Sequence, residues 1–159
     1  MLEMVLTVAI VSILAGLGAD IMMKTNQYFL LTRTRLDLQR QARSIMYVMS
    51  REIRQAQNAT IVLTQQASQP PCSTITFTTG SGKVVTYEQI GNQLIQYVTP
   101  SGKPTQKMVL TKNLEYLAFS FPRSDDLTII SLSLTLQEII SQGREKSLHT
   151  ASQQIQVMN

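Results

Sequence analysis

The segment that decides the fold is residues 1–23, MLEMVLTVAIVSILAGLGADIMM. From Met4 to its end, this segment carries a single ionisable side chain, Asp20. A helix rises about 1.5 Å per residue, so these residues span about 30 Å, the thickness of the hydrocarbon core of a bilayer. A cleavable signal peptide would carry Lys or Arg before a shorter apolar run, whereas this run follows an acid and continues into helical sequence. We therefore predict a retained transmembrane helix over residues 1–23.

Glu3 stands at the start of the apolar run, and the next acidic residue is Asp20. Moving a carboxylate to the middle of a bilayer costs on the order of 3 kcal/mol, so such a group normally has a partner or a function. An acid at a helix N-terminus is also favoured by the helix dipole, by about 0.3 to 1 kcal/mol. Glu3 is therefore the first candidate functional residue, and the dipole alone is the alternative explanation for it.

The run LEMVLTVAIVSILA, residues 2–15, resembles the N-terminus of type IV pilins and of type II secretion pseudopilins. The match is most specific over residues 2–7, where Glu3 occupies the position of the family's glutamate. The resemblance implies that Glu3 pairs with the free N-terminal amine of a neighbouring subunit during filament assembly. It also implies three kinds of partner: other pilins or pseudopilins of the same filament, the inner-membrane assembly machinery and the prepilin peptidase.

The orientation in the membrane is predicted differently by the charges and by the resemblance. Seven basic and two acidic residues follow the apolar run between residues 24 and 56. Basic residues beside a membrane helix normally stay in the cytoplasm, so they predict a cytoplasmic domain. The family's basic leader, its peptidase-site glycine and its first aromatic residue are absent here, and we expect the true start to be missing. The resemblance implies a basic leader upstream, which would reverse the orientation that the charges predict. The protein is then expected to be a single-pass bacterial inner-membrane protein with a periplasmic domain, or a subunit incorporated in a filament.

Length and composition allow one small domain after the membrane segment, over residues 24–159. Apolar residues make up 43% of the 159-residue chain, which is enough for a hydrophobic core. Charged residues make up only 15%, against about 25% in average soluble proteins. Ser, Thr and Gln replace them, and this bias is typical of extracytoplasmic β-rich domains.

The helix is predicted to continue past the membrane segment to about Gln57. Apolar residues recur at intervals of three and four, at Leu38, Ala42, Ile45, Met49, Ile53 and Ala56. This period indicates an amphipathic helix with one buried face. Residues 40–56 again resemble J-type pseudopilins and PilW-like minor pilins. Gly16 and Gly18 weaken the helix by about 1 kcal/mol each relative to Ala, so they are the predicted points of helix flexibility.

After Asn58 the apolar period changes to two, which predicts strands. The alternation places strands near residues 75–77, 83–87, 94–98, 107–110, 117–121, 131–136 and 147–157. Turns are predicted at residues 80–82, 91–92, 100–104, 122–126 and 142–143. The fold class predicted is α+β, with a long N-terminal helix, membrane-spanning in its first half and amphipathic in its second, laid across an antiparallel sheet. The resemblance implies the same layout, including a last strand that ends near a terminal Asn, here Asn159.

Catalytic and metal-binding residues are not predicted from this sequence. Cys72 follows two prolines and is expected to be a turn residue, and His149 stands alone on a predicted strand. Asp125 and Asp126 form one adjacent pair in a loop, short of the roughly six to eight oxygens that Ca²⁺ prefers. We therefore expect no enzyme, no metal site and no cofactor.

Arg33, Arg35, Arg40 and Arg43 form a candidate basic interaction face on the predicted helix. Such a face attracts nucleic acid or anionic lipid headgroups in some proteins. Few aromatic residues interleave with these cations, so a solvated or subunit-facing side is the favoured interpretation, and nucleic acid is not an expected partner. The function predicted is a minor structural subunit of a type IV pilus or type II pseudopilus, at the filament tip or in its initiation complex. The alternative is a membrane-anchored extracytoplasmic binding module that does not polymerise.

Overall fold

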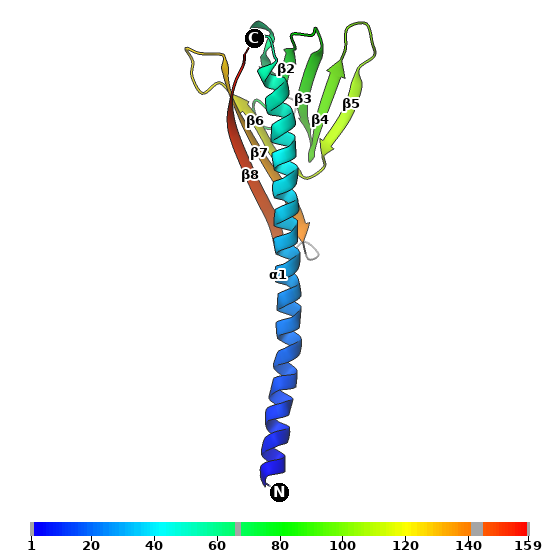
Figure 1. The fold of residues 1–159 in the computed structure, drawn as a ribbon, viewed down its shortest axis with the longest axis vertical. Coiled ribbons are helices and arrows are strands. Elements are labelled where there is room, and N and C mark those ends of the chain that lie inside the picture. Colours follow the sequence, from blue (N-terminus) through cyan, green and yellow to red (C-terminus); the bar gives the residue numbers. More distant parts are fainter. Residues whose placement is uncertain (1, 66–67, 141–144, 159) are drawn as a thin grey trace.

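A computed structural model describes residues 2–65, 68–140 and 145–158 of the chain. The chain begins with one helix, α1 (Leu2–Arg54), whose 53 residues extend over about 80 Å at about 1.5 Å per residue. The C-terminal half of α1 lies against β-sheets, and its N-terminal half projects beyond them (Figure 1). The predicted long N-terminal helix and the α+β class are confirmed.

The described strands form two antiparallel sheets, with the strand orders β1-β2-β3-β4-β5 and β6-β7-β8. The first sheet consists of β1 (Val62–Thr64), β2 (Thr74–Thr78), β3 (Val84–Ile90), β4 (Gln93–Thr99) and β5 (Gln106–Thr111). The second consists of β6 (Leu114–Ser120), β7 (Ile129–Ile140) and β8 (Glu145–Gln156). A short 3₁₀ helix, Asn58–Thr60, connects α1 to β1.

The prediction of a single sheet is wrong, because the chain leaves the first sheet between β5 and β6. Only residues 112–113 separate these strands, yet β6 pairs with β7. The β4–β5 ladder shifts register between Leu94 and Ile95, and most of β5 is exposed, so β5 forms an outer edge. Leu117 and Phe119 of β6 are buried in a second layer instead.

The two sheets are joined along β6 by hydrogen bonds outside the strand ladders. The Phe119 N–H donates to the Cys72 carbonyl at 2.9 Å. The Gln89 side chain is buried between the sheets, where its Oε1 accepts from the Leu117 N–H at 3.0 Å and its Nε2 donates to the Glu115 carbonyl at 3.3 Å. The outer edge of β6 is therefore covered.

The core lies between α1 and the two sheets. Every residue of the predicted helical stripe is buried: Leu38, Ala42, Ile45, Met49, Ile53 and Ala56. Helix α1 contacts β8 and β7 most extensively, and the stripe forms one hydrophobic core with residues of both sheets. The predicted alternation of β7 is also confirmed, since Leu132, Leu134 and Leu136 are fully buried. Each such side chain stabilises the fold by about 1.5 to 3 kcal/mol relative to exposure.

The element boundaries differ from the predicted ones in several places. Helix α1 ends at Arg54 and not at about Gln57, because the Gln57 N–H bonds to the Thr78 carbonyl at 2.8 Å. Phe121 lies just beyond β6 and is only partly buried against the core. Strand β1 was not predicted, because its three residues are too few to show an alternation. The turn predicted at residues 142–143 and the terminal Asn159 lie outside the described residues.

The predicted turns at residues 80–82 and 91–92 connect β2 to β3 and β3 to β4. Gly82 and Gly91 have φ angles of 78° and 57° there, a region that favours glycine because it has no Cβ. Cys72 lies in the turn before β2, as predicted, and has a positive φ of 55°.

Candidate functional site

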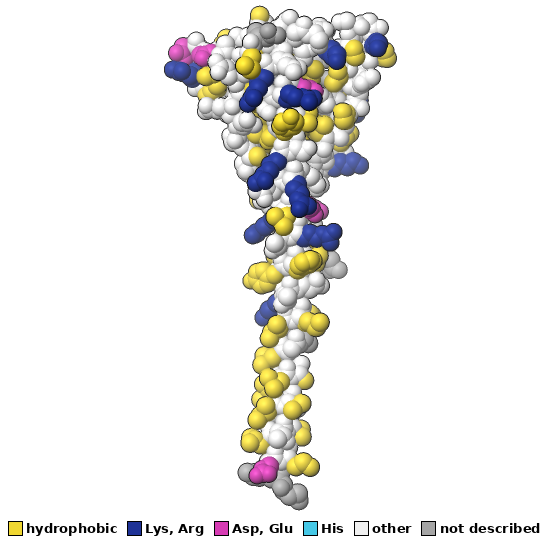
Figure 2. Space-filling view, in the orientation of Figure 1, with side chains coloured by type: hydrophobic (Ala, Val, Ile, Leu, Met, Phe, Trp, Pro, Cys, Tyr) yellow, Lys and Arg dark blue, Asp and Glu magenta, His cyan; other side chains and the backbone are white. Residues whose placement is uncertain are grey.

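The N-terminal half of α1 exposes an apolar surface along its whole length (Figure 2). Val8, Ile13 and Ile21 are 65%, 63% and 63% exposed, and their apolar neighbours are similarly uncovered. Among the described residues, α1 is the one helix long and apolar enough, by length and composition, to cross a membrane. The surface is too large to be left in water, so lipid or other protein must cover it.

Two hydroxyl groups inside this apolar half are satisfied by the helix backbone itself. The Thr7 hydroxyl donates to the Met4 carbonyl at 2.9 Å, and the Ser12 hydroxyl donates to the Val8 carbonyl at 2.8 Å. Such back-bonding leaves no hydroxyl donor unpaired in a medium without water. These side chains therefore add little cost to burial in lipid or in a helix bundle.

Asp20, the one acidic group within the apolar run, forms an ion pair with Lys24. The Asp20 Oδ2 and Lys24 Nζ atoms are 2.9 Å apart, one helical turn from each other. From the sequence, Asp20 was noted only as the one ionisable group of the run; its spacing of four residues from Lys24 is the signal that would have identified this pair. The pair lies at the end of the apolar segment, where a charged group is least costly.

Glu3 lies in the first turn of α1 and is exposed. In the described part of the chain, no side chain forms an ion pair with its carboxylate. Its position at the helix N-terminus is favourable for a negative charge, by about 0.3 to 1 kcal/mol. The structure thus places Glu3 at the far end of the projecting helix, available to a group from another molecule.

Gly16 and Gly18 lie within an unbroken stretch of α1. A Cβ added at either position would meet nothing within 4 Å. No close approach of another element therefore requires glycine at these positions, and helix flexibility at Gly16 and Gly18 stays a prediction.

The predicted basic face is only partly one surface. Arg33, Arg35, Arg40 and Arg43 are all exposed. With about 3.6 residues per turn, Arg33 and Arg40 are two turns apart and lie on the same side, whereas Arg35 points to nearly the opposite side from both. Arg40 also lies 3.9 Å from Asp37, an exposed pair of little energetic consequence. Arg43 belongs with residues further along the helix that the sequence interpretation did not select.

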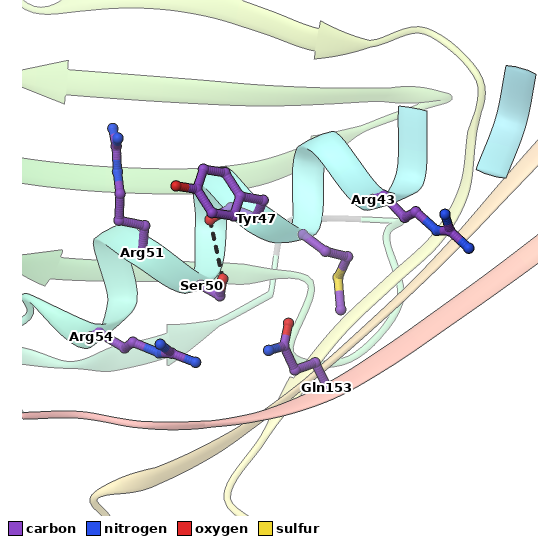
Figure 3. Close-up of a pocket in the computed structure, with 7 residues that line it drawn as sticks. Arg43, Tyr47, Ser50, Arg51, Arg54 and Gln153 are labelled. Carbon is purple, nitrogen blue, oxygen red and sulfur yellow. Dashed lines mark hydrogen bonds between the residues drawn. The ribbon is translucent and has the colours of Figure 1, made fainter. Parts of the chain in front are cut away.

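Arg43, Arg51 and Arg54 lie around Tyr47 on the exposed side of the C-terminal half of α1 (Figure 3). With Met46, Ser50 and Gln153, they line a shallow hollow between α1 and β8. Tyr47 is 66% exposed. Within residues 2–65, 68–140 and 145–158, no carboxylate forms an ion pair with any of these three arginines. The spacing of four, four and three residues from Arg43 to Arg54 is the signal that would have identified this surface.

A buried polar network fixes α1 to the first sheet. The Tyr87 hydroxyl donates to Glu52 Oε2 at 2.6 Å, and Gln96 Nε2 donates to the same oxygen at 2.8 Å. Burial, followed by the bond to Glu52, raises the pKa of the Tyr87 hydroxyl far above its ordinary value. Tyr87 therefore stays protonated and remains a donor. No sequence pattern indicated this network, because its members come from three separate elements.

The other candidate residues lie apart from one another. His149 lies on β8, an outer strand, and Cys72 lies in a turn, as predicted. Asp126 accepts hydrogen bonds from the Thr128 hydroxyl and N–H, which lower the pKa of its carboxyl group. Among the described residues, no group of three or more His, Cys, Asp or Glu side chains could hold a metal ion.

Burial raises the pKa of Glu88 on β3, and the ammonium group of Lys107 partly offsets this effect. Glu88 lies in the first sheet and is not among the residues that line the hollow beside β8.

No known family model, curated protein or solved structure matches the chain. The geometry of α1 and its surroundings therefore carries the functional interpretation.

Proposed function

We propose that the chain is a minor structural subunit of a type IV pilus or a type II secretion pseudopilus. It is anchored in the bacterial inner membrane by residues 1–23, with its β domain on the extracytoplasmic side, and it assembles through the same helix. Its place is at the tip of the filament or in its initiation complex. Other pilins or pseudopilins, the inner-membrane assembly machinery and the prepilin peptidase are its proposed partners.

The observation that carries the proposal is the division of α1 into two halves. The C-terminal half buries its apolar stripe against this chain's own sheets, whereas the N-terminal half exposes apolar residues all round. Such a half-buried helix is suited first to lipid and then to a bundle formed by the N-terminal halves of several subunits. The pilin-like run at residues 2–15 supports the same interpretation.

Glu3 has a defined role in this proposal. In a helix bundle that excludes water, its carboxylate requires a cation, and the free N-terminal amine of an adjacent subunit supplies one. Removing one partner of a buried ion pair costs about 3 to 5 kcal/mol, because the other charge is left alone. Insertion of a single subunit into lipid does not incur this loss, since an uncharged side chain enters lipid more readily.

Glu3→Ala in the full-length protein tests the assignment in the native host. We expect normal abundance in the carbonate-resistant membrane fraction, together with loss of crosslinking to partner pilins and of incorporation into filaments. Glu3→Gln, which keeps the shape of the side chain, should fail in the same way. Met4→Ala removes an exposed neighbour on the same turn and should assemble like the wild type.

The alternative function is a membrane-anchored extracytoplasmic binding module whose helix serves only as an anchor. The observation that favours it is a β domain that buries the C-terminal half of α1 by itself. Wild-type crosslinking and activity of both Glu3 variants would favour this alternative and exclude assembly through Glu3. A cytoplasmic location of a reporter fused after Asn159 would exclude both functions, because each requires an extracytoplasmic domain.

A further inference from the structure

The described strands leave four outer sheet edges, on β1, β5, β6 and β8. An uncovered edge is a template for another strand, and proteins normally shorten, charge or cover it. β1 has only three residues. β5 carries Lys107, whose ammonium group lies 5.9 Å from the centre of the Tyr97 ring. The edge of β6 is covered by its bonds to Cys72 and Gln89.

The outer edge of β8 is neither short nor, along residues 147–156, charged, and among the described residues its backbone is bonded on that side only at the C-terminal end. The strand has 12 residues and pairs with β7 without a register shift. Residues 146–156 contain neither Pro nor Gly, and Lys146 at one end is their single charged residue. β8 is therefore the longest regular edge that the described strands offer to a partner.

The hydrogen-bond pattern shows which groups of β8 face outward. The Val157 N–H donates to the Thr128 carbonyl of the β7 side at 2.8 Å. Bonded residues alternate along an antiparallel ladder, so odd-numbered residues of β8 bond to β7 and even-numbered residues direct their N–H and C=O groups outward. In the described part of the chain, one backbone hydrogen bond is formed on this outer side. It lies just beyond the C-terminal end of β8, where the Met158 N–H donates to the Arg54 carbonyl at 3.1 Å.

The hollow lined by arginines lies beside this edge. Gln153 of β8 projects toward α1, and the side chains of Arg43 and Arg54 extend toward β8 on either side of it (Figure 3). Arg43 and Arg54 are both exposed residues, and no carboxylate of the described residues forms an ion pair with them. A row of backbone donors and acceptors therefore runs beside two unpaired cations.

We propose that the outer edge of β8 and the adjacent Arg43 and Arg54 form a docking groove for an extended acidic peptide segment of a partner protein. The segment adds a fourth strand to the second sheet, next to β8. Its alternate side chains face α1, where carboxylates meet the two arginines. Because the groove lies in the domain half of α1, this inference goes beyond the proposed function and does not depend on Glu3.

The dimensions of the groove fit such a segment. Arg43 and Arg54 lie about 16 Å apart along the helix axis, at about 1.5 Å per residue. Residues on one face of a strand recur every second position, so acids four or six positions apart are separated by about 13 or 20 Å. Arg side chains are long enough to accommodate either spacing. Acidic residues at alternate positions of the peptide thus reach both cations.

A second copy of the chain is a poorer occupant of the edge. β8 and α1 run in the same direction, toward the end of the domain farthest from the N-terminus (Figure 1). Antiparallel pairing of two β8 edges would point the two apolar helix halves in opposite directions, which one membrane does not allow. Nucleic acid would meet the arginines but has no repeating N–H and C=O groups to match the strand edge.

Binding of a synthetic peptide to the full chain in detergent micelles tests the proposal. The probe alternates Glu with Thr and Val, and the matched control has Gln in place of every Glu. In fluorescence anisotropy at fixed salt, we expect the Glu peptide to bind at least about tenfold more tightly than the Gln peptide. Hydrogen exchange should show slower exchange of the even-numbered amides of β8 on binding, with the odd-numbered amides unchanged.

Variants separate the contribution of the edge from that of the cations. Arg43→Gln and Arg54→Gln should each weaken binding of the Glu peptide by several-fold, whereas Arg33→Gln, outside the hollow, should not. Gln154→Pro removes an outward N–H without removing a bond to β7 and should abolish binding, whereas Gln154→Ala should bind normally. If the proline variant does not fold, a Glu peptide N-methylated at alternate residues gives the same test and should not bind.

Several binding results would each overturn the proposal. They are equal affinity for the Glu and Gln peptides, unchanged binding by both arginine variants, normal binding of the N-methylated peptide, and tighter binding of duplex DNA than of the Glu peptide at the same salt. Self-association of the chain through β8 that excludes the peptide would also overturn it, in favour of a contact between copies.

Discussion

The two halves of α1 share one continuous backbone but have opposite surroundings. Ile13 in the first half is 63% exposed, whereas Ile53 in the second half is fully buried against the sheets of its own domain. The first half is apolar all round, and the second carries an apolar stripe with basic residues opposite. The comparison shows that the arrangement of apolar residues, more than their number, indicates whether a helix is covered by its own chain or by another medium.

The largest effect that would sharpen this comparison comes from placing the same charge in each half. Ile53→Asp buries an unpaired carboxylate in the core and should destabilise the domain by on the order of 4 kcal/mol. Ile13→Asp should leave the domain's stability unchanged, because nothing in the domain covers that side chain. Urea unfolding of the full chain in detergent, followed by tyrosine fluorescence and by protease resistance of the β domain, measures both values.

Membrane insertion should show the reverse order. Ile13→Asp should reduce insertion, because a carboxylate near mid-bilayer costs about 3 kcal/mol, whereas Ile53→Asp should insert normally. A stable Ile53→Asp domain would contradict the burial of the stripe. Normal insertion of Ile13→Asp would contradict the assignment of the first half to lipid.

The sequence was sufficient to predict the elements whose pattern is local. The helical stripe of α1 and the alternation of Leu132, Leu134 and Leu136 are both buried as expected, because a single face of each element is apolar. The split into two sheets could not be predicted, because β5 and β6 follow each other closely in the chain and could equally well have paired with each other in one sheet. What separates them is the exposure of β5 and the side-chain bonds of Gln89, and neither has a local signature.

An intermediate effect tests how the second half of α1 is attached to the first sheet. Tyr87→Phe removes one of the two donors to Glu52 and leaves its carboxylate less well satisfied. Leaving a buried acceptor short of a donor costs about 1 to 3 kcal/mol, and Glu52 is half-buried, so we expect destabilisation of about 1.5 kcal/mol. Urea unfolding of the full chain measures the difference.

Tyr116→Phe is the matched control for this change. Tyr116 is 42% exposed on β6, so loss of its hydroxyl should change the unfolding free energy by no more than about 0.5 kcal/mol. Equal effects of the two substitutions would show that the Glu52 network contributes nothing specific. Membrane insertion should be unaffected by either, because both residues lie in the β domain.

The candidate site was only partly predictable for a similar reason. Glu3 was selected from resemblance and Arg33, Arg35, Arg40 and Arg43 from charge, and these assignments stay predictions. The contribution of Arg54 depends on β8, a strand about 100 residues away in the chain. Sequence spacing indicates which residues share a helix face, but it does not indicate which strand edge lies beside that face. The hollow between α1 and β8 therefore required the tertiary structure.

The smallest effect concerns two exposed ion pairs of α1, one in each half. Asp20 and Lys24 are 2.9 Å apart at the end of the apolar segment, and Asp37 and Arg40 are 3.9 Å apart beside the domain. In water such a pair contributes about 0.3 to 0.5 kcal/mol, so Arg40→Gln should change neither insertion nor unfolding measurably.

Near lipid the effective dielectric constant is lower and the same attraction is larger. Lys24→Gln should therefore make insertion less favourable by about 1 kcal/mol, because the Asp20 carboxylate loses its counterion. A translocon insertion assay of the first half of α1 measures this cost, and removal of both charges by Asp20→Asn with Lys24→Gln should restore insertion. Equal insertion of Lys24→Gln and the wild type would place Asp20 in water and shorten the membrane segment at its C-terminal end.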